Sequence, residues 1–187
     1  MSVQKEITIS GVGGQGLILC GTLLAQAAVC HDGKRATLSS EYGVETRGTF
    51  AKSDVIVSDS EIYFPEATEP DVVVCLHQIA YERYTGTVPA KTLLIYDADQ
   101  VKPRPENAAH EAGLSILSAA RELGNTATAN IITLGIIAGI TGAISSEAAH
   151  SALSERFGAK GEKVVALNVK AFDRGAALGK KLRTQFC

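Results

Sequence analysis

Glu6-Ile-Thr-Ile-Ser-Gly-Val-Gly-Gly-Gln-Gly-Leu17 is the stretch that decides the fold. Its first half alternates polar and apolar residues, as a strand does, and Leu17 to Val29 carries apolar side chains at helical spacing. The glycines lie between the two periodic segments, where a tight turn is expected. We therefore predict that Lys5 to Val29 forms a strand, a glycine-rich loop and a helix.

The glycine-rich loop has the G-x-G-x-x-G spacing through Gly11, Gly13 and Gly16, with Gly14 and Gln15 between them. Glycines allow a tight turn and let backbone N–H groups approach a phosphate, and the positive end of the following helix favours an anion. Gln15 adds a side-chain amide. This loop predicts a site for a phosphate-bearing cofactor or substrate. The alternative is a tight turn whose glycines serve only close packing.

The rest of the chain alternates strands and helices in its first half and is mostly helical in its second half. This alternation predicts a three-layer α/β/α sandwich with a mainly parallel central sheet and a Rossmann-like start. Ser146 is predicted to cap one of the later helices. The predicted strands are Glu6 to Ser10, Arg35 to Ser39, Phe50 to Ser58, Asp71 to Leu76 and Thr92 to Tyr96; the predicted helices are Leu17 to Val29, Gln78 to Tyr84, Ser115 to Leu123, Ala129 to Ala143, Ser146 to Phe157 and Lys163 to Leu182.

Composition limits the class of protein. The 187 residues suit a single domain over 1–187, and 45% hydrophobic with 20% charged residues is a globular balance. A net charge of -2 without a basic stretch argues against nucleic acid. The start is polar, and the apolar run Ile131 to Ile144 is too short to span a bilayer, so we expect a cytoplasmic protein with no membrane contact.

The cysteines and histidines predict no metal site. Neither set has the local spacing of a zinc or iron–sulfur motif. Among the histidines, His77 is the best candidate for chemistry because it follows a buried strand, and its alternative role is to bond backbone at the strand end. The cysteines are Cys20, Cys30, Cys75 and Cys187, and the histidines are His31, His77, His110 and His150.

A second loop, Tyr42-Gly-Val-Glu-Thr-Arg-Gly48, has the composition of a binding loop. Arg47 could pair with a phosphate or carboxylate, and Glu45 could orient its guanidinium. Tyr42, Gly43 and Gly48 complete the candidate site. The alternative is an exposed loop with a surface ion pair.

A dinucleotide site remains a rival at this stage. Such a site needs an acid roughly 20 residues after the glycine loop to hold ribose hydroxyls. Glu41 lies 25 residues after Gly16 and could be that acid. Asp97 and Asp99 could also bind a ribose, although solvated turn residues are the simpler interpretation.

Taken together, the two loops at this separation resemble the γ subunit of 2-oxoacid:ferredoxin oxidoreductases, most closely that of the 2-oxoglutarate enzyme. The resemblance spans nearly the whole chain. It continues through Asp71-Val-Val-Val-Cys-Leu76, Leu123-Gly-Asn125, Asn130, Leu134-Gly135, Asn168 and Ala171-Phe172. One departure is Thr49, where the family pattern has a second glycine after Arg47-Gly48.

The resemblance implies a subunit of an enzyme that oxidatively decarboxylates a 2-oxoacid, forms an acyl-coenzyme A and reduces ferredoxin. It implies that thiamine diphosphate and iron–sulfur clusters lie on partner α, β and ferredoxin-like δ subunits. The two loops would then contact coenzyme A phosphates in the complex, with no catalytic residue on this chain, which alone would be inactive.

Three functions stay open from the residues: this γ subunit, a free-standing NAD-dependent oxidoreductase, and a scaffold subunit whose glycine loop only packs. The choice among 2-oxoglutarate, pyruvate and branched-chain 2-oxoacids is open, as are the stoichiometry and a homodimer. The apolar segment Ile131 to Ile140 is predicted to be a core helix or a surface that meets a partner subunit.

Overall fold

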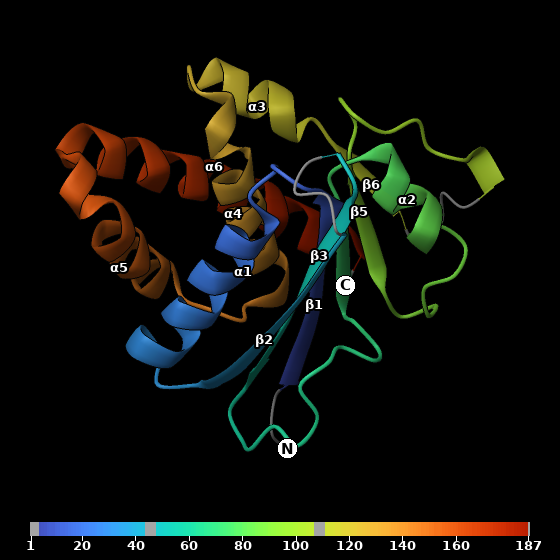
Figure 1. Cartoon of the computed structure of the whole chain (residues 1–187), viewed down its shortest axis with the longest axis horizontal. Helices are drawn as coiled ribbons and strands as arrows, with labels where there is room; N and C mark the ends of the chain where they lie inside the picture. The colour runs from blue at the N-terminus through green and yellow to red at the C-terminus, as the bar shows by residue number, and fades with distance from the viewer. Residues whose placement is uncertain (1–3, 44–47, 107–110, 187) are drawn as a thin grey trace.

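The structure of the chain is a computed structural model that describes residues 4–43, 48–106 and 111–186. Its centre is a six-stranded sheet in the order β2-β3-β1-β4-β5-β6, with helices on both faces (Figure 1). The predicted α/β class and layered architecture are therefore confirmed. The strands are β1 (Gln4–Val12), β2 (Arg35–Tyr42), β3 (Phe50–Ser58), β4 (Val72–Cys75), β5 (Leu93–Asp97) and β6 (Glu111–Leu114).

The central strands are buried because both of their faces are covered. All four residues of β4 are buried, and β4 pairs in parallel with β1 on one side and β5 on the other. Strands buried on both faces need apolar side chains at every position, which explains the near-continuous valine run. The carboxyl ends of β1, β4 and β5 lie at the same end of the sheet, and the glycine loop lies there too.

β3 runs antiparallel to both of its neighbours, β1 and β2, so the sheet is mixed. Tyr42 at the end of β2 pairs with Ala51 near the start of β3, and the second loop joins the two strands as a hairpin. β2 is thus an edge strand that does not touch β1. This arrangement differs from a Rossmann half, in which the strand beside β1 is parallel to it.

β6 was missed by the sequence analysis. It is short, contains Gly113, and pairs in parallel with β5 through Leu94↔Glu111 to Asp97↔Leu114. Tyr81 and Thr85 from the helix Gln78–Tyr84 and its C-cap hold β6 in place, because their hydroxyls donate to the Glu111 carboxylate at 2.6 and 2.7 Å.

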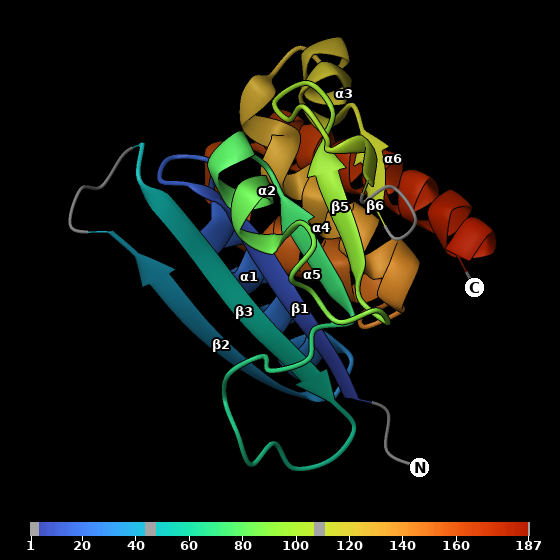
Figure 2. The same cartoon turned by 90° about the vertical axis from the view of Figure 1, so that its right-hand side faces the viewer.

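One helix, α2, lies on one face of the sheet, and the other α-helices lie on the opposite side (Figure 2). There α1 and α4 contact the strands, and α3, α5 and α6 pack against these two helices. The α2 bounds match the prediction, and those of α5 do too, but Ser145 rather than Ser146 caps α5 by accepting a hydrogen bond from Ala148 N. The α-helices are α1 (Leu17–Gln26), α2 (Gln78–Tyr84), α3 (Ile116–Glu122), α4 (Ala129–Thr141), α5 (Ser146–Phe157) and α6 (Glu162–Phe186); shorter helical segments are η1 (Ala27–His31), η3 (Thr126–Thr128) and η4 (Gly158–Lys160).

α4 and α6 cross at close range through glycines on both helices. A Cβ atom built on Gly135 would lie 2.1 Å from Phe172 O, and one built on Gly175 would lie 2.0 Å from Ile132 O. Backbone therefore packs directly on backbone. The glycine face of α4 is occupied by α6 of the same chain, which favours the core-helix interpretation over a partner surface for that face.

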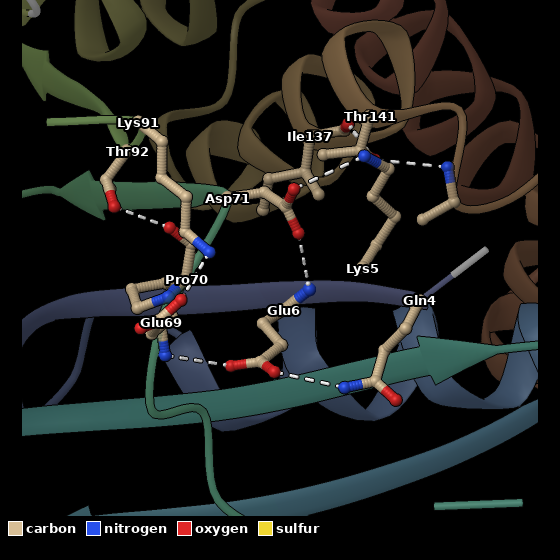
Figure 3. A network of polar contacts seen from close by, with 11 residues as sticks. Gln4, Lys5, Glu6, Glu69, Pro70, Asp71, Lys91, Thr92, Ile137 and Thr141 are labelled. Carbon is tan, nitrogen blue, oxygen red and sulfur yellow. Dashed lines mark hydrogen bonds and ion pairs between the residues drawn. The ribbon is translucent and has the colours of Figure 1, made fainter. Parts of the chain in front are cut away.

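A polar network holds the chain together at the end of the sheet opposite the glycine loop (Figure 3). Asp71 accepts from Glu6 N at 2.9 Å and forms an ion pair with Lys5 at 3.3 Å. Glu6 in turn accepts from the backbone N–H groups of Thr68 and Glu69 at 2.9 and 3.0 Å. The loop between β3 and β4 is thereby attached to the start of β1, at the end of the sheet remote from the candidate site.

No helix within the described ranges is long and apolar enough to cross a membrane.

Candidate functional site

A cleft of about 710 Å³ opens beside the glycine loop at the carboxyl ends of β1, β4 and β5. Besides Leu76, Asp97, Gln100 and Leu117, its lining comes from three distant parts of the sequence. The glycine loop and the start of α1 form one wall, the segment from Asn125 to Asn130 forms a second, and Phe157, Lys160 and the first turns of α6 form a third. This is the position at which ligands bind in open α/β sheets.

The glycine loop reaches the cleft through Gly14, Gln15 and Gly16. Gly14 has φ 101° and Gly16 has φ 75°, conformations that strongly favour glycine, and Gly16 caps α1 without a side-chain hydrogen bond. A Cβ on Gly16 would also lie 2.3 Å from Asn130 Nδ2. Position 16 therefore requires glycine for both conformation and space, and it leaves backbone rather than side chain at the start of α1.

The Gln15 amide is used within the chain. Its Oε1 atom accepts from Val12 N at 2.8 Å, and its Nε2 atom donates to Leu76 O at 2.8 Å. These two bonds join the loop to the end of β4. Gln15 lines the cleft, and the ligand contact predicted for its amide would compete with the bonds that shape the loop.

Gly11 and Gly13 act behind the cleft surface. A Cβ on Gly11 would lie 2.3 Å from Gln15 Oε1, so this glycine makes room for the amide that shapes the loop. Gly13 N donates to Thr49 O at 3.0 Å, which ties the glycine loop to the end of the second loop. Neither residue lines the cleft.

The second loop is described at its two ends. Tyr42 is 67% exposed, and Gly48 has φ 79°. A Cβ on Gly43 would lie 2.8 Å from Thr49 Oγ1, so the Thr49 side chain packs against the glycine at the other end of the loop. Glu45 and Arg47 lie outside the described residues, and their roles stay predictions.

Glu41 does not occupy the ribose position of a dinucleotide site. It lies on the edge strand β2, with β3 between it and β1, so its strand is roughly 10 Å from β1 at the usual spacing of about 4.8 Å per strand. Its carboxylate forms an ion pair with Lys52 at 3.7 Å instead. The reversed β3 therefore removes the geometry on which this candidate depended.

Asp97 and Asp99 serve as caps of α3. Asp97 Oδ1 accepts from the N–H groups of Asp99 and Ile116, both at 3.1 Å, and from Leu117 at 3.5 Å. Asp99 accepts from the backbone and hydroxyl of Ser118 at 2.6 and 2.9 Å. Burial raises the pKa of the Asp97 carboxyl above its ordinary value, and the hydrogen bonds from backbone N–H groups offset only part of that rise. The turn-residue interpretation therefore describes their contacts better than ribose binding does.

His77 caps α2, since its Nδ1 atom accepts from Ile79 N at 3.2 Å. This is the alternative role that the sequence analysis gave it. Over the described part of the chain, no three His, Cys, Asp or Glu side chains gather as metal ligands would.

The sequence analysis did not predict Asn130, Asn168 and Lys160 as residues of the candidate site. Asn130 and Asn168 are both 6% exposed and line the cleft, and Lys160 brings a cation to it. Asn168 Nδ2 donates to Val164 O at 2.8 Å. The family resemblance was the sequence signal for Asn130 and Asn168, and Lys160 had none, because no local motif joins residues so far from the glycine loop.

Comparisons with known proteins identify relatives of the whole chain. The sequence profile of the family described as "Pyruvate ferredoxin/flavodoxin oxidoreductase" matches residues 6–178. A 2-oxoglutarate synthase subunit KorC of Methanocaldococcus jannaschii is 33% identical over 97% of both chains. A "Pyruvate/ketoisovalerate oxidoreductases common subunit gamma" of Thermococcus kodakarensis is 30% identical over 90% of this chain and 96% of the relative.

Solved structures extend the agreement to the fold. The γ subunit of a keto/oxoacid ferredoxin oxidoreductase from Geobacter sulfurreducens superposes with a TM-score of 0.82 at 36% identity, covering 96% of this chain and 98% of that one. The Magnetococcus marinus 2-oxoglutarate:ferredoxin oxidoreductase, with 2-oxoglutarate, coenzyme A and succinyl-CoA bound, superposes with a TM-score of 0.85 at 29% identity. That match covers 95% of this chain and 31% of the other.

The chain therefore belongs to the pyruvate ferredoxin/flavodoxin oxidoreductase family. Within the family it is a γ-type subunit of 2-oxoacid:ferredoxin oxidoreductases, and the resemblance drawn from the two loops is confirmed.

Proposed function

We propose that this chain is the subunit that forms one wall of the coenzyme A site in a thiamine-diphosphate-dependent 2-oxoacid:ferredoxin oxidoreductase. The complex would oxidatively decarboxylate a 2-oxoacid to an acyl-coenzyme A and pass two electrons to ferredoxin. Partner α, β and ferredoxin-like δ subunits would carry thiamine diphosphate and the iron–sulfur clusters. This chain alone would be inactive.

The observation that carries the proposal is the cleft beside the glycine loop. Gly14 and Gly16 present backbone to a cleft of about 710 Å³, at the start of a helix that has no side-chain cap. A helix start of this kind favours an anionic group such as a phosphate. The Magnetococcus marinus enzyme, with coenzyme A bound, matches 95% of this chain, which supports coenzyme A as the ligand.

The second loop supports the same ligand. The residue that follows it, Thr49, accepts a hydrogen bond through its backbone O from Gly13 N, which ties the end of the second loop to the glycine loop. Arg47 of the second loop would contact a phosphate, with Glu45 orienting it. Tyr42, which is 67% exposed, would lie at the mouth of the assembled site.

Selectivity for the 2-oxoacid would reside mainly on the partner subunits. One relative is by its name a γ subunit common to pyruvate and ketoisovalerate oxidoreductases, and others are named as 2-oxoglutarate synthase subunits. A single kind of γ chain serving several 2-oxoacids is what a coenzyme A role predicts, because coenzyme A is common to these reactions.

An NAD-dependent enzyme is the rival that the fold disfavours. The reversed β3 separates Glu41 from β1, so the described residues offer no ribose acid on the strand beside the glycine loop. A scaffold role remains the second rival. There, the glycine loop would matter for packing alone.

Reconstitution separates the three functions. A complex prepared without this chain, then supplemented with it, should regain coenzyme A-dependent ferredoxin reduction, whereas NAD should not bind the chain or support turnover. Tight NAD binding by the chain would favour the rival enzyme. If the supplemented complex regained activity with an unchanged KM for coenzyme A when the loop residues were substituted, the chain would be a scaffold.

A further inference from the structure

The side-chain carbonyl oxygen of Asn130 is buried beside the cleft. The residue lies in the first turn of α4 and in the cleft wall, and it is 6% exposed. Its Nδ2 atom donates a long bond of 3.4 Å to Gly16 O, and Oδ1 has no hydrogen-bond partner among the described residues. If the Asn130 amide were flipped, its Oδ1 atom would face Gly16 O at 3.4 Å, and two acceptor oxygens repel each other. The orientation with Nδ2 toward Gly16 O is therefore the favourable one.

This arrangement costs stability in the free chain. A buried acceptor without a donor costs about 1–3 kcal/mol, and a neutral hydrogen bond at 3.4 Å recovers little of it. The residues that follow Asn130, from Ile131 to Gly139, are all buried and mostly apolar. An apolar side chain would suit the packing of α4 better than asparagine, so packing does not account for the amide at this position.

Among the described residues, those that line the cleft carry too little charge to hold a cluster of phosphates. Its charged lining residues are Lys160 and Asp97, and Asp97 Oδ1 is already bonded to three backbone N–H groups. Lys160 is exposed, and much of the remaining lining is apolar, including Leu19, Leu76 and Leu167. One cation at the rim suits one anionic group, whereas the interior suits an uncharged group that carries N–H donors.

We propose that the cleft takes an uncharged arm of the ligand whose N–H group donates to Asn130 Oδ1, and that phosphate stays at the rim near Lys160. This proposal rests on the proposed coenzyme A role and specifies which part of the molecule enters. Two parts have the required chemistry: the amide-bearing pantetheine arm and the amino-bearing adenine ring. The phosphates would be left to the rim, to the backbone of Gly14 and Gly16 at the start of α1, and to Arg47.

A tryptophan probe tests the proposal directly because the chain has no tryptophan of its own. Leu167→Trp places the only indole in the cleft wall, and Tyr63→Trp, at a residue 89% exposed and outside the cleft lining, is the matched control. The full-length chain is titrated with coenzyme A, pantetheine, adenosine and inorganic pyrophosphate. The cleft probe should respond to coenzyme A and to pantetheine or adenosine, whichever is the arm, while the control should stay silent.

Asn130→Leu, added to the cleft probe, should weaken binding of coenzyme A and of the responding fragment about tenfold, the loss of one hydrogen bond. The thermal midpoint of the Asn130→Leu chain should be unchanged or higher than that of the parent. Lys160→Ala should weaken coenzyme A and leave the fragment unaffected.

Three results would overturn the proposal. They are a cleft probe silent to every ligand, a cleft probe that responds to pyrophosphate but to neither fragment, and a fragment affinity that Asn130→Leu leaves unaltered. In the third case, a lowered thermal midpoint would give Asn130 a structural role only. None of these results depends on Arg47, so failure here is distinct from failure of the coenzyme A role in the complex.

Discussion

Gly13 N and Thr49 O are joined by a hydrogen bond of 3.0 Å, and this bond links the two loops that carry the family resemblance. The Thr49 side chain also packs against Gly43 at the other end of the second loop. The sequence analysis expected a glycine at position 49 from the family pattern. A glycine there would keep the backbone bond to Gly13 but would lose the side-chain contact with Gly43.

Gly135→Ala should destabilise the chain by about 3 kcal/mol or more, because the new Cβ would meet Phe172 O at 2.1 Å and backbone atoms cannot move aside cheaply. Chemical denaturation measures the loss. Gly158→Ala is the matched control. Gly158 has a helical φ of -54° and open space around its Cβ position, so this change should be neutral or add up to about 1 kcal/mol. Equal effects of the two changes would contradict the close crossing of α4 and α6.

Gln15→Glu should destabilise the glycine loop by about 1–3 kcal/mol, because it removes the donor to Leu76 O and places a second oxygen against it. The acceptor for Val12 N is kept, so the loss reports the bond to β4. Hydrogen exchange of the loop amides, together with denaturation, measures the effect. An unchanged unfolding free energy would mean that the amide does not hold the loop in this shape.

Asp97→Asn should change how stability depends on pH. Burial raises the pKa of Asp97 in the folded chain above its ordinary value, so the folded state loses stability as pH rises from about 4 through the raised pKa. Asparagine keeps the Oδ1 acceptor that the three N–H groups use and cannot ionise.

The unfolding free energy of Asp97→Asn, relative to the parent, should therefore increase across that pH range and level off above it. Denaturation at intervals between pH 3 and neutrality measures the difference, with the pH interval set by the ordinary aspartate pKa of about 3.9. A difference that shrinks as pH rises would contradict the assigned direction.

Local pattern was enough to predict most elements. The bounds of α2 and α5 agree because helical periodicity and flanking turn residues decide them, and β4 agrees because a valine run leaves little choice. β6 was missed because Glu111-Ala-Gly-Leu114 has no strand pattern of its own; its pairing with β5 makes it a strand. This pairing depends on the tertiary structure, so the local sequence does not reveal it.

The reversed β3 had a signal that was not used. Ten residues, 40–49, separate the predicted strands, and seven, 43–49, separate β2 from β3 in the structure, whereas a parallel crossover needs about a dozen or more. Part of the candidate site could be predicted from the sequence, and the rest depends on how the helices pack. The glycine loop is a contiguous motif, but Asn130, Lys160 and Asn168 reach the cleft only through the packing of α4 and α6.

The coenzyme A role is tested most directly by KM values in the assembled complex. Arg47→Ala should raise the KM for coenzyme A about tenfold to a hundredfold, the loss of one charge-assisted contact, with the KM for the 2-oxoacid unchanged. Arg35→Ala is the matched control, because Arg35 begins β2 opposite Ser58 at the far end of the sheet from the glycine loop. An Arg47→Ala complex whose KM for coenzyme A equals that of the Arg35→Ala complex would contradict the account.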